Sequence, residues 1–212
     1  MHPHLLESAD GLTQWLLRQA MDGLPPLESA AQLAARVRGD PKHETHDARV
    51  DALVRREVAK SFTAGFVTGM AGLLTLPIAL PASLGATWVL QARMAAALAA
   101  LWGHDLEDPW VHSTVLLSLV GGGAPETLRR AGVRAGEWAA RRAMGRLSEG
   151  TLHEVNRRIG FRLLSTASSR GAINLGRVVP VVGALTAGVV DAYGCRAVAN
   201  QANRLLKLPV QS

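Results

Sequence analysis

The feature that most constrains this chain is a long stretch without a charged residue, from Ser61 to Ala92. It reads SFTAGFVTGMAGLLTLPIALPASLGATWVLQA and is long enough to cross a bilayer, which takes about 20 apolar residues. Pro77 and Pro81 lie near its middle, however, and proline lacks the N–H that continues a helix. We therefore expect a hairpin of two helical arms. It forms either the core of a soluble bundle or a membrane-inserting element.

A second uncharged segment, residues 178–190, resembles the first in layout. It reads VVPVVGALTAGVV and is too short to span a membrane alone. Both segments carry proline, and both carry glycines of the kind that let helices approach closely, so we expect them to pack against each other. Arg93 follows the first segment and Asp191 the second. Because buried charges need partners, we predict that Arg93 and Asp191 form a buried pair.

The rest of the chain also indicates helices, because Ala and Leu are abundant and no strand-like alternation occurs. Apolar periodicity, prolines, glycines and capping residues predict helices over residues 5–20, 27–38, 47–76, 82–102, 109–120, 125–147, 149–168 and 180–206. The fold class is therefore an all-α bundle of about seven or eight helices around the central hairpin. The polar stretch RGDPKHETHD predicts a boundary between a loosely attached appendage, residues 1–45, and a helical domain, residues 46–206, with a tail at 207–212.

Three stretches together resemble the EcsC family: TAGFVTGMAGLLTLPIALP, QARMAAALAALWGHDLEDP and VVPVVGALTAGVVDA. Their order and spacing carry the likeness, which covers roughly residues 46–206. The resemblance implies a helical bacterial protein encoded alongside transport components, in a family whose biochemical activity is not established. It thus supports the fold and leaves the reaction, if any, open.

The net charge of +6 is concentrated in one region. Residues 126–177 hold eleven arginines and four glutamates, or +7, so the remainder carries about −1. On one predicted helix over residues 125–147, Arg130, Arg134 and Arg141 share a stripe, with Glu126 and Glu137 four residues before two of them. This stripe is either a solvated, self-paired face or a surface for anionic lipid. Few aromatic residues and no recognised motif argue against nucleic acid.

Residues with catalytic or metal-binding chemistry are few. His104, Asp105 and Asp108, with Arg93 on the preceding helix, are the weak candidates for a polar catalytic pocket. Asp108 also has the alternative of capping the helix that begins at Pro109. His43 and His46 have metal-ligand spacing, but a solvated polar linker explains them better, and we assign no metal and no cofactor. Cys195 beside Arg196 is expected to be a packing residue rather than a reactive thiol.

These observations favour a non-enzymatic accessory or interaction protein over an enzyme with a pocket around His104, Asp105, Asp108 and Arg93. With one cysteine and no secretory pattern at its N-terminus, the chain is expected in the cytoplasm, associated peripherally with the inner face of a membrane. The partner that this reading implies is an anionic membrane surface or a membrane protein. The oligomeric state is not determined by the sequence.

Overall fold

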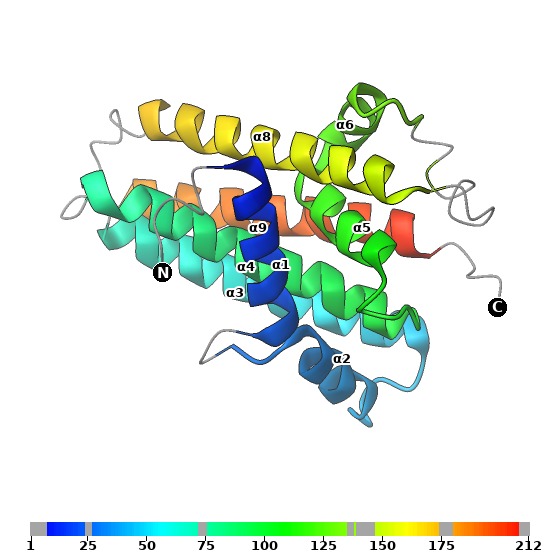
Figure 1. Cartoon of the computed structure of the whole chain (residues 1–212). Coiled ribbons are helices and arrows are strands. Elements are labelled where there is room, and N and C mark those ends of the chain that lie inside the picture. Colours follow the sequence, from blue (N-terminus) through cyan, green and yellow to red (C-terminus); the bar gives the residue numbers. More distant parts are fainter. Residues whose placement is uncertain are drawn as a thin grey trace.

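The computed structural model describes residues 8–23, 27–71, 76–134, 138, 147–173 and 180–207, with the side chains of 66–71, 76–84, 167–173 and 180–184 excepted. Within these ranges the fold is all-helical, as the composition predicts (Figure 1). Its α-helices are α1 (Ala9–Asp22), α2 (Ala30–Arg38), α3 (His46–Ala71), α4 (Leu76–Leu101), α5 (Pro109–Leu119), α6 (Ala124–Arg130), α8 (Glu149–Ile173) and α9 (Pro180–Leu206). A single turn of 3-10 helix, η2 (Gly121–Gly123), leads into α6.

Capping residues account for several helix starts. Asp108 accepts a hydrogen bond from the Trp110 N–H at 2.8 Å, and Pro109 occupies the first position of α5, where an N–H would have no partner. Ser148 accepts from the Thr151 N–H at 3.2 Å and caps α8. Helix α9 begins at Pro180, as predicted. These positions confirm the expected starts near residues 109, 149 and 180.

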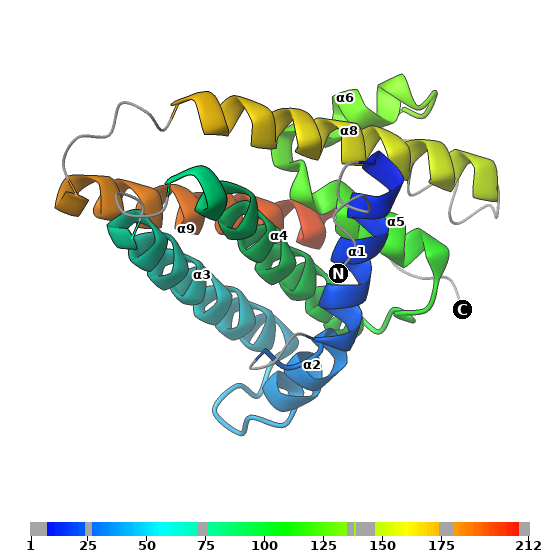
Figure 2. The same cartoon turned by 60° about the vertical axis from the view of Figure 1, so that its left-hand side comes forward.

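Helix α4 lies at the centre of the molecule. All residues from Trp88 to Ala99 are buried, and α1, α2, α3, α5 and α9 each pack against this helix (Figure 2). Five of the twelve residues in this segment are alanine, whose small side chain lets neighbouring helices approach on several sides. The last residues of the predicted hairpin, from Trp88 to Ala92, therefore belong to the hydrophobic core. Pro77 lies in the first turn of α4 rather than between the two arms.

The two uncharged segments pack against each other through glycine, as expected. Helices α3 and α9 share the most extensive helix–helix interface of the described residues. A Cβ added to Gly65 of α3 would lie 3.0 Å from the Ala187 carbonyl oxygen of α9. A Cβ added to Gly188 of α9 would lie 2.9 Å from the Phe62 carbonyl oxygen of α3. The absence of these two side chains is what permits the close approach.

The N-terminal residues do not form the loosely attached appendage that the sequence suggested. Apolar side chains of α1 and α2 are buried in the same hydrophobic core as α4 and α9; they include Leu12, Leu16, Ala20, Leu33 and Val37. Helix α1 packs against both α4 and α8, and α8 approaches Ala9 closely at Gly160. The polar stretch after α2 is thus a connection within one core rather than a domain boundary.

The helix predicted over residues 125–147 begins as expected but ends early. Helix α6 ends at Arg130, and Gly132 then adopts φ +75°, a left-handed conformation that suits glycine. The Val133 N–H donates to the Leu128 carbonyl at 2.9 Å, and both side chains are buried. This is the Schellman arrangement that terminates helices at glycine. Arg130 and Arg134 therefore do not share one helical stripe, and Arg141 lies outside the described residues.

No helix in the described part of the chain combines the length and the apolar character that crossing a bilayer requires.

Candidate functional site

A buried ion pair lies where α3, α4 and α2 meet. Arg93 of α4 is fully buried, and its Nη2 donates to Glu57 Oε2 of α3 at 2.5 Å. The other Glu57 oxygen accepts from Lys60 Nζ at 2.7 Å, at the edge of the core. Arg93 Nη1 also donates to the Glu28 carbonyl at 3.2 Å. One guanidinium thus connects α3, α4 and the segment before α2.

The predicted pairing of Arg93 with Asp191 is therefore wrong. The carboxylate that forms the ion pair with Arg93 belongs to Glu57. Asp191 is only partly buried and lies against α3 farther along the interface. A Cβ at Gly65 would lie 2.6 Å from its Oδ2 atom. The sequence reasoning was right that Arg93 is buried with a charged partner. It missed Glu57, which lies in a charged stretch, RREVAK, that looks solvent-exposed.

The catalytic candidates around His104 each make a local structural contact instead of converging. His104 Nε2 lies 2.8 Å from the Leu206 carbonyl at the end of α9. Asp105 accepts from the Glu107 N–H at 3.0 Å in the turn before α5, and Asp108 caps that helix. Arg93 lies eight residues before the end of α4, about 12 Å along the helix axis. The residues proposed for a pocket are thus not brought together with Arg93.

The histidines of the polar connection also have structural surroundings. His43 Nε2 lies 4.0 Å from Asp40, and the His46 ring packs 4.2 Å from the Trp102 ring, centroid to centroid. The Trp102 indole N–H donates to Asn203 Oδ1 at 3.1 Å and so links the ends of α4 and α9. Within the described ranges, no group of three or more His, Cys, Asp or Glu side chains is arranged to hold a metal ion.

Cys195 is a buried residue of the α3–α4–α9 interface. Its Sγ lies 3.6 Å from the Met94 sulfur, and burial raises the pKa of the thiol to about 11. At neutral pH the thiol is therefore protonated and is a poor nucleophile. This agrees with the expected packing role.

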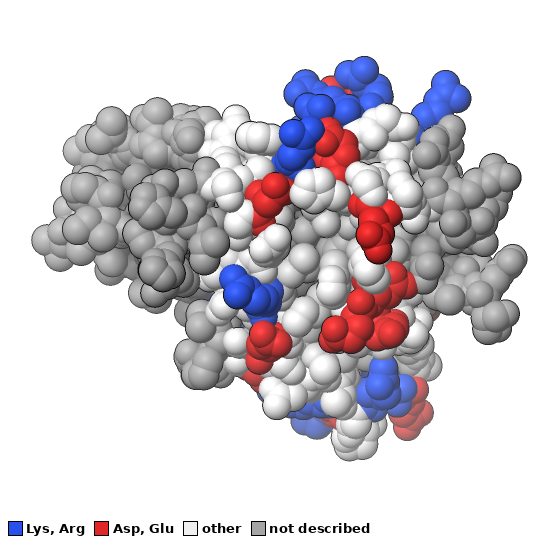
Figure 3. Space-filling view, viewed as in Figure 1, with Lys and Arg blue, Asp and Glu red and all other residues white. Residues whose placement is uncertain are grey.

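A basic cluster on α6 and α8 is the strongest candidate for a binding surface. We define the arginine surface as Glu126, Arg129 and Arg130 of α6 together with Glu154, Arg157, Arg158, Phe161 and Arg162 of α8. Basic side chains gather there at the top of the molecule (Figure 3). Five arginines and two glutamates give this surface a charge of +3. Phe161 is more than half exposed among them.

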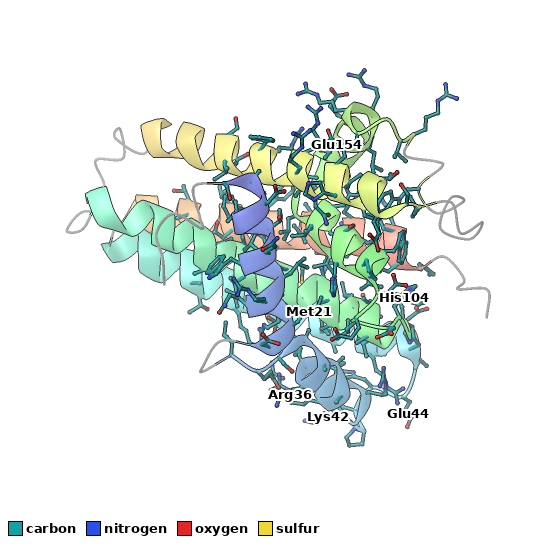
Figure 4. All side chains as sticks on the ribbon, viewed as in Figure 1. Met21, Arg36, Lys42, Glu44, His104 and Glu154 are labelled. Atoms are coloured by element: carbon teal, nitrogen blue, oxygen red, sulfur yellow. The ribbon has the colours of Figure 1, made fainter. Side chains whose placement is uncertain are left out.

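The two helices repeat one sequence pattern, Glu-x-x-Arg-Arg, and one geometry. In α6, Arg129 binds Glu126 through Nε at 2.7 Å and Nη2 at 2.8 Å, whereas Arg130 binds it through Nε alone at 2.7 Å. In α8, Arg157 donates to Glu154 through Nε and Nη2, both to Oε2, and Arg158 donates to Oε1 through Nε alone. Glu154 points outward from α8 among these arginines (Figure 4).

This geometry leaves one guanidinium in each motif available. The Nε bonds orient Arg130 and Arg158, and their terminal nitrogens have no acceptor among the described residues. Arg162 lies one turn beyond Arg158 and packs its guanidinium over Gly123, which has no side chain to obstruct it. Planar guanidinium groups held in this way match the oxygens of phosphate and carboxylate groups.

The carboxylates of the surface stay ionised far below neutral pH. Hydrogen bonds from Arg129 and Arg130 lower the pKa of Glu126 to about 2. Hydrogen bonds from Arg158 and Arg157 likewise lower the pKa of Glu154. The net charge of the surface is consequently constant across the physiological pH range.

Of the three arginines that the sequence suggested for an anion-binding surface, one belongs to the arginine surface defined above. Arg130 belongs to the arginine surface, while Arg134 is exposed beyond the end of α6. The contributions of Arg157, Arg158 and Arg162 were missed, although the repeated Glu-x-x-Arg-Arg pattern is a signal that sequence reasoning can detect. Comparison of the chain with protein-family models, curated proteins and solved structures finds no match. The resemblance to EcsC proteins accordingly stays a prediction.

Proposed function

We propose that this chain is a non-enzymatic accessory protein that binds peripherally to the anionic, cytoplasmic face of a membrane. The observation that carries the proposal is the pair of Glu-x-x-Arg-Arg motifs on α6 and α8. Each motif holds one arginine in place and leaves its terminal nitrogens outward. Phospholipid phosphates offer the oxygens that such groups bind, and a polybasic surface contributes about 1 kcal/mol of membrane affinity per basic residue.

Two further observations support an interaction protein over an enzyme. The residues considered for catalysis make caps, turns and interhelical hydrogen bonds with the protein itself. The resemblance to the EcsC family adds the expectation of a role beside transport or secretion components. The proposal thus assigns the chain a surface for recruitment rather than a pocket for chemistry.

Sedimentation with lipid vesicles tests this function. The chain is mixed with vesicles of phosphatidylcholine alone or with about 30% phosphatidylserine, a composition chosen to reproduce an anionic leaflet. We expect binding that requires phosphatidylserine and weakens as salt rises. The triple variant Arg130→Gln, Arg158→Gln and Arg162→Gln should bind on the order of 100-fold more weakly, because three contributions of about 1 kcal/mol are removed.

A matched control removes the same charge elsewhere. Arg18 of α1 and Arg55 and Arg56 of α3 are exposed and lie outside the arginine surface. Their replacement by glutamine should change vesicle binding far less than the triple variant does. Equal loss in both variants indicates that net charge alone drives binding, and equally strong retention on single-stranded DNA indicates a nucleic-acid surface. Either result contradicts the proposal.

A further inference from the structure

Helix α9 carries an exposed apolar stripe at its beginning. Leu185, Val189, Val190 and Tyr193 are 47%, 59%, 49% and 78% exposed. They are four of the five large hydrophobic residues that are exposed within the described ranges, Phe161 being the fifth. At 100° per residue all four fall within an arc of about 140° on one side of the helix. Thr186, which is also exposed, lies within the same arc. The face is therefore mainly apolar, and a mainly apolar face on an exposed helix indicates a contact surface.

The stripe is graded along the helix. Leu185 comes first, the two valines follow, and Tyr193 lies about 12 Å beyond Leu185 at a rise of 1.5 Å per residue. The next exposed residue on the same side is Arg196. The acidic residue of this segment, Asp191, faces α3 at Gly65 instead. Apart from Thr186, the order of the exposed residues along the helix is therefore aliphatic, then aromatic, then basic.

This beginning of α9 lies beside the other long uncharged stretch of the chain. The end of α3 and the start of α4 lie at the same end as the start of α9 (Figures 1 and 2). Residues 61–92 and 178–190 contain no Asp, Glu, Lys or Arg. Helix α8, which carries the arginine surface, also runs toward this end; it has no charged residue from 163 to 169, and Arg170 follows near its end. Helix α8 thus joins the arginine surface to the end of the molecule where the uncharged stretches of α3, α4 and α9 lie.

We infer that the first half of α9 inserts into the membrane interface, with its aliphatic residues among the acyl chains. Tyr193 then lies at the level of the lipid carbonyls and Arg196 at the phosphates, where aromatic and basic residues are favoured. The inference rests on the proposed membrane function and adds a hydrophobic anchor to it.

A lipid surface fits the stripe better than a second copy of the chain does. Four half-exposed side chains offer on the order of 300 Å² of apolar area, by the usual area per buried side chain. A stable protein interface buries about 800 Å² on each partner. The gradation toward Tyr193 and Arg196 also follows the polarity profile of a bilayer interface. A protein partner requires no such order.

Environment-sensitive labels on α9 test the depth directly. Cys195 is buried and protonated at neutral pH, so a cysteine introduced by Val189→Cys can be labelled selectively with a nitrobenzoxadiazole dye. The matched control is Asn200→Cys, an exposed position about 16 Å farther along α9. On phosphatidylserine-containing vesicles, we expect a blue shift and quenching by brominated acyl chains at position 189 and neither at position 200.

Unlabelled variants distinguish this hydrophobic anchor from the proposed binding of the arginine surface to lipid headgroups, which we call the headgroup function. Val189→Ser combined with Tyr193→Ser should weaken vesicle binding of the chain about tenfold or more. The same two substitutions should also weaken the residual vesicle binding of the glutamine triple variant. If the unlabelled chain sediments with vesicles but the label at 189 shows no shift, the anchor is refuted and the headgroup function stands. If the chain binds no vesicles, both are refuted. A blue shift without vesicles that grows with protein concentration identifies a second copy as the occupant and also overturns the inference.

Discussion

At the scale of single residues, the buried Arg93–Glu57 ion pair is the feature on which the stability of the core depends most directly. Both side chains are about 1% exposed, so removing one charge leaves the other buried without compensation. We expect Glu57→Gln to lower the free energy of unfolding by about 3–5 kcal/mol, as measured by chemical denaturation. Glu57→Gln combined with Arg93→Met should recover much of this loss, because it removes both charges.

A control for this prediction is Glu44→Gln, since Glu44 is exposed in the polar connection before α3. It should change stability by no more than about 0.5 kcal/mol. A loss below about 1 kcal/mol in Glu57→Gln would show that Arg93 finds another partner or solvent, contrary to the burial of the pair.

The Glu126 carboxylate provides a pH-dependent prediction. Its pKa is lowered from 4.5 to about 2 by hydrogen bonds from Arg129 and Arg130. Because the folded-state pKa is depressed, the contacts stabilise the folded chain above pH 4.5 and are lost as pH falls toward 2. Carbon-detected NMR of the side-chain carboxyl should give a midpoint near 2, moving up toward 4.5 in Arg129→Gln combined with Arg130→Gln. A wild-type midpoint near 4.5 contradicts the paired geometry.

The Arg93–Glu57 ion pair also shows which part of the core could be predicted from the sequence and which could not. The burial of Arg93 was predictable, because an isolated charge within a long apolar helix must find a partner. Its partner was not, because helical periodicity identifies the inward face of a helix without identifying the helix opposite. Glu57 and Asp191 both face the α3–α9 region, and only the packing shows which of them reaches Arg93.

At the scale of elements, helix α9 requires glycine where it packs on α3 and tolerates a side chain where it packs on α4. A Cβ at Gly188 would lie 2.9 Å from the Phe62 carbonyl oxygen, whereas one at Gly194 would meet Gln91 at an ordinary 3.5 Å. We expect Gly188→Ala to destabilise the chain by about 1–3 kcal/mol. Gly194→Ala should be neutral or stabilising by up to about 1 kcal/mol, since alanine favours helix. Thermal unfolding of the two variants distinguishes them, and equal melting temperatures would contradict the close contact.

Element boundaries were predictable where a side chain creates the cap. Asp108 with Pro109 and Ser148 are local signals, so α5 and α8 begin where the sequence indicates. The end of α6 was missed because its signal is a backbone conformation at Gly132, stabilised by the burial of Leu128 and Val133. In an Arg- and Ala-rich context favourable to helix, a single glycine reads as a tolerated interruption.

At the scale of the whole molecule, the chain separates its two long uncharged stretches from a basic side. The uncharged stretches were visible in the sequence, and so was the basic excess of residues 126–177. The arginine surface itself was not, because its two motifs are separated by 28 positions and come together only when α6 packs against α8. The N-terminal helices were misjudged for a related reason, since their burial depends on partners far along the chain.

That dependence affects how the chain is made. The apolar face of α1 is covered by α4 and α8, yet α8 begins at Glu149. At a synthesis rate of about 5–20 residues per second, α1 is made roughly 6–30 seconds before its last helical partner is available. During this interval Leu12 and Leu16, both buried in the finished fold, remain uncovered on that side. A nascent chain of this topology is therefore a natural client for chaperones that shield an early helix until a late one arrives.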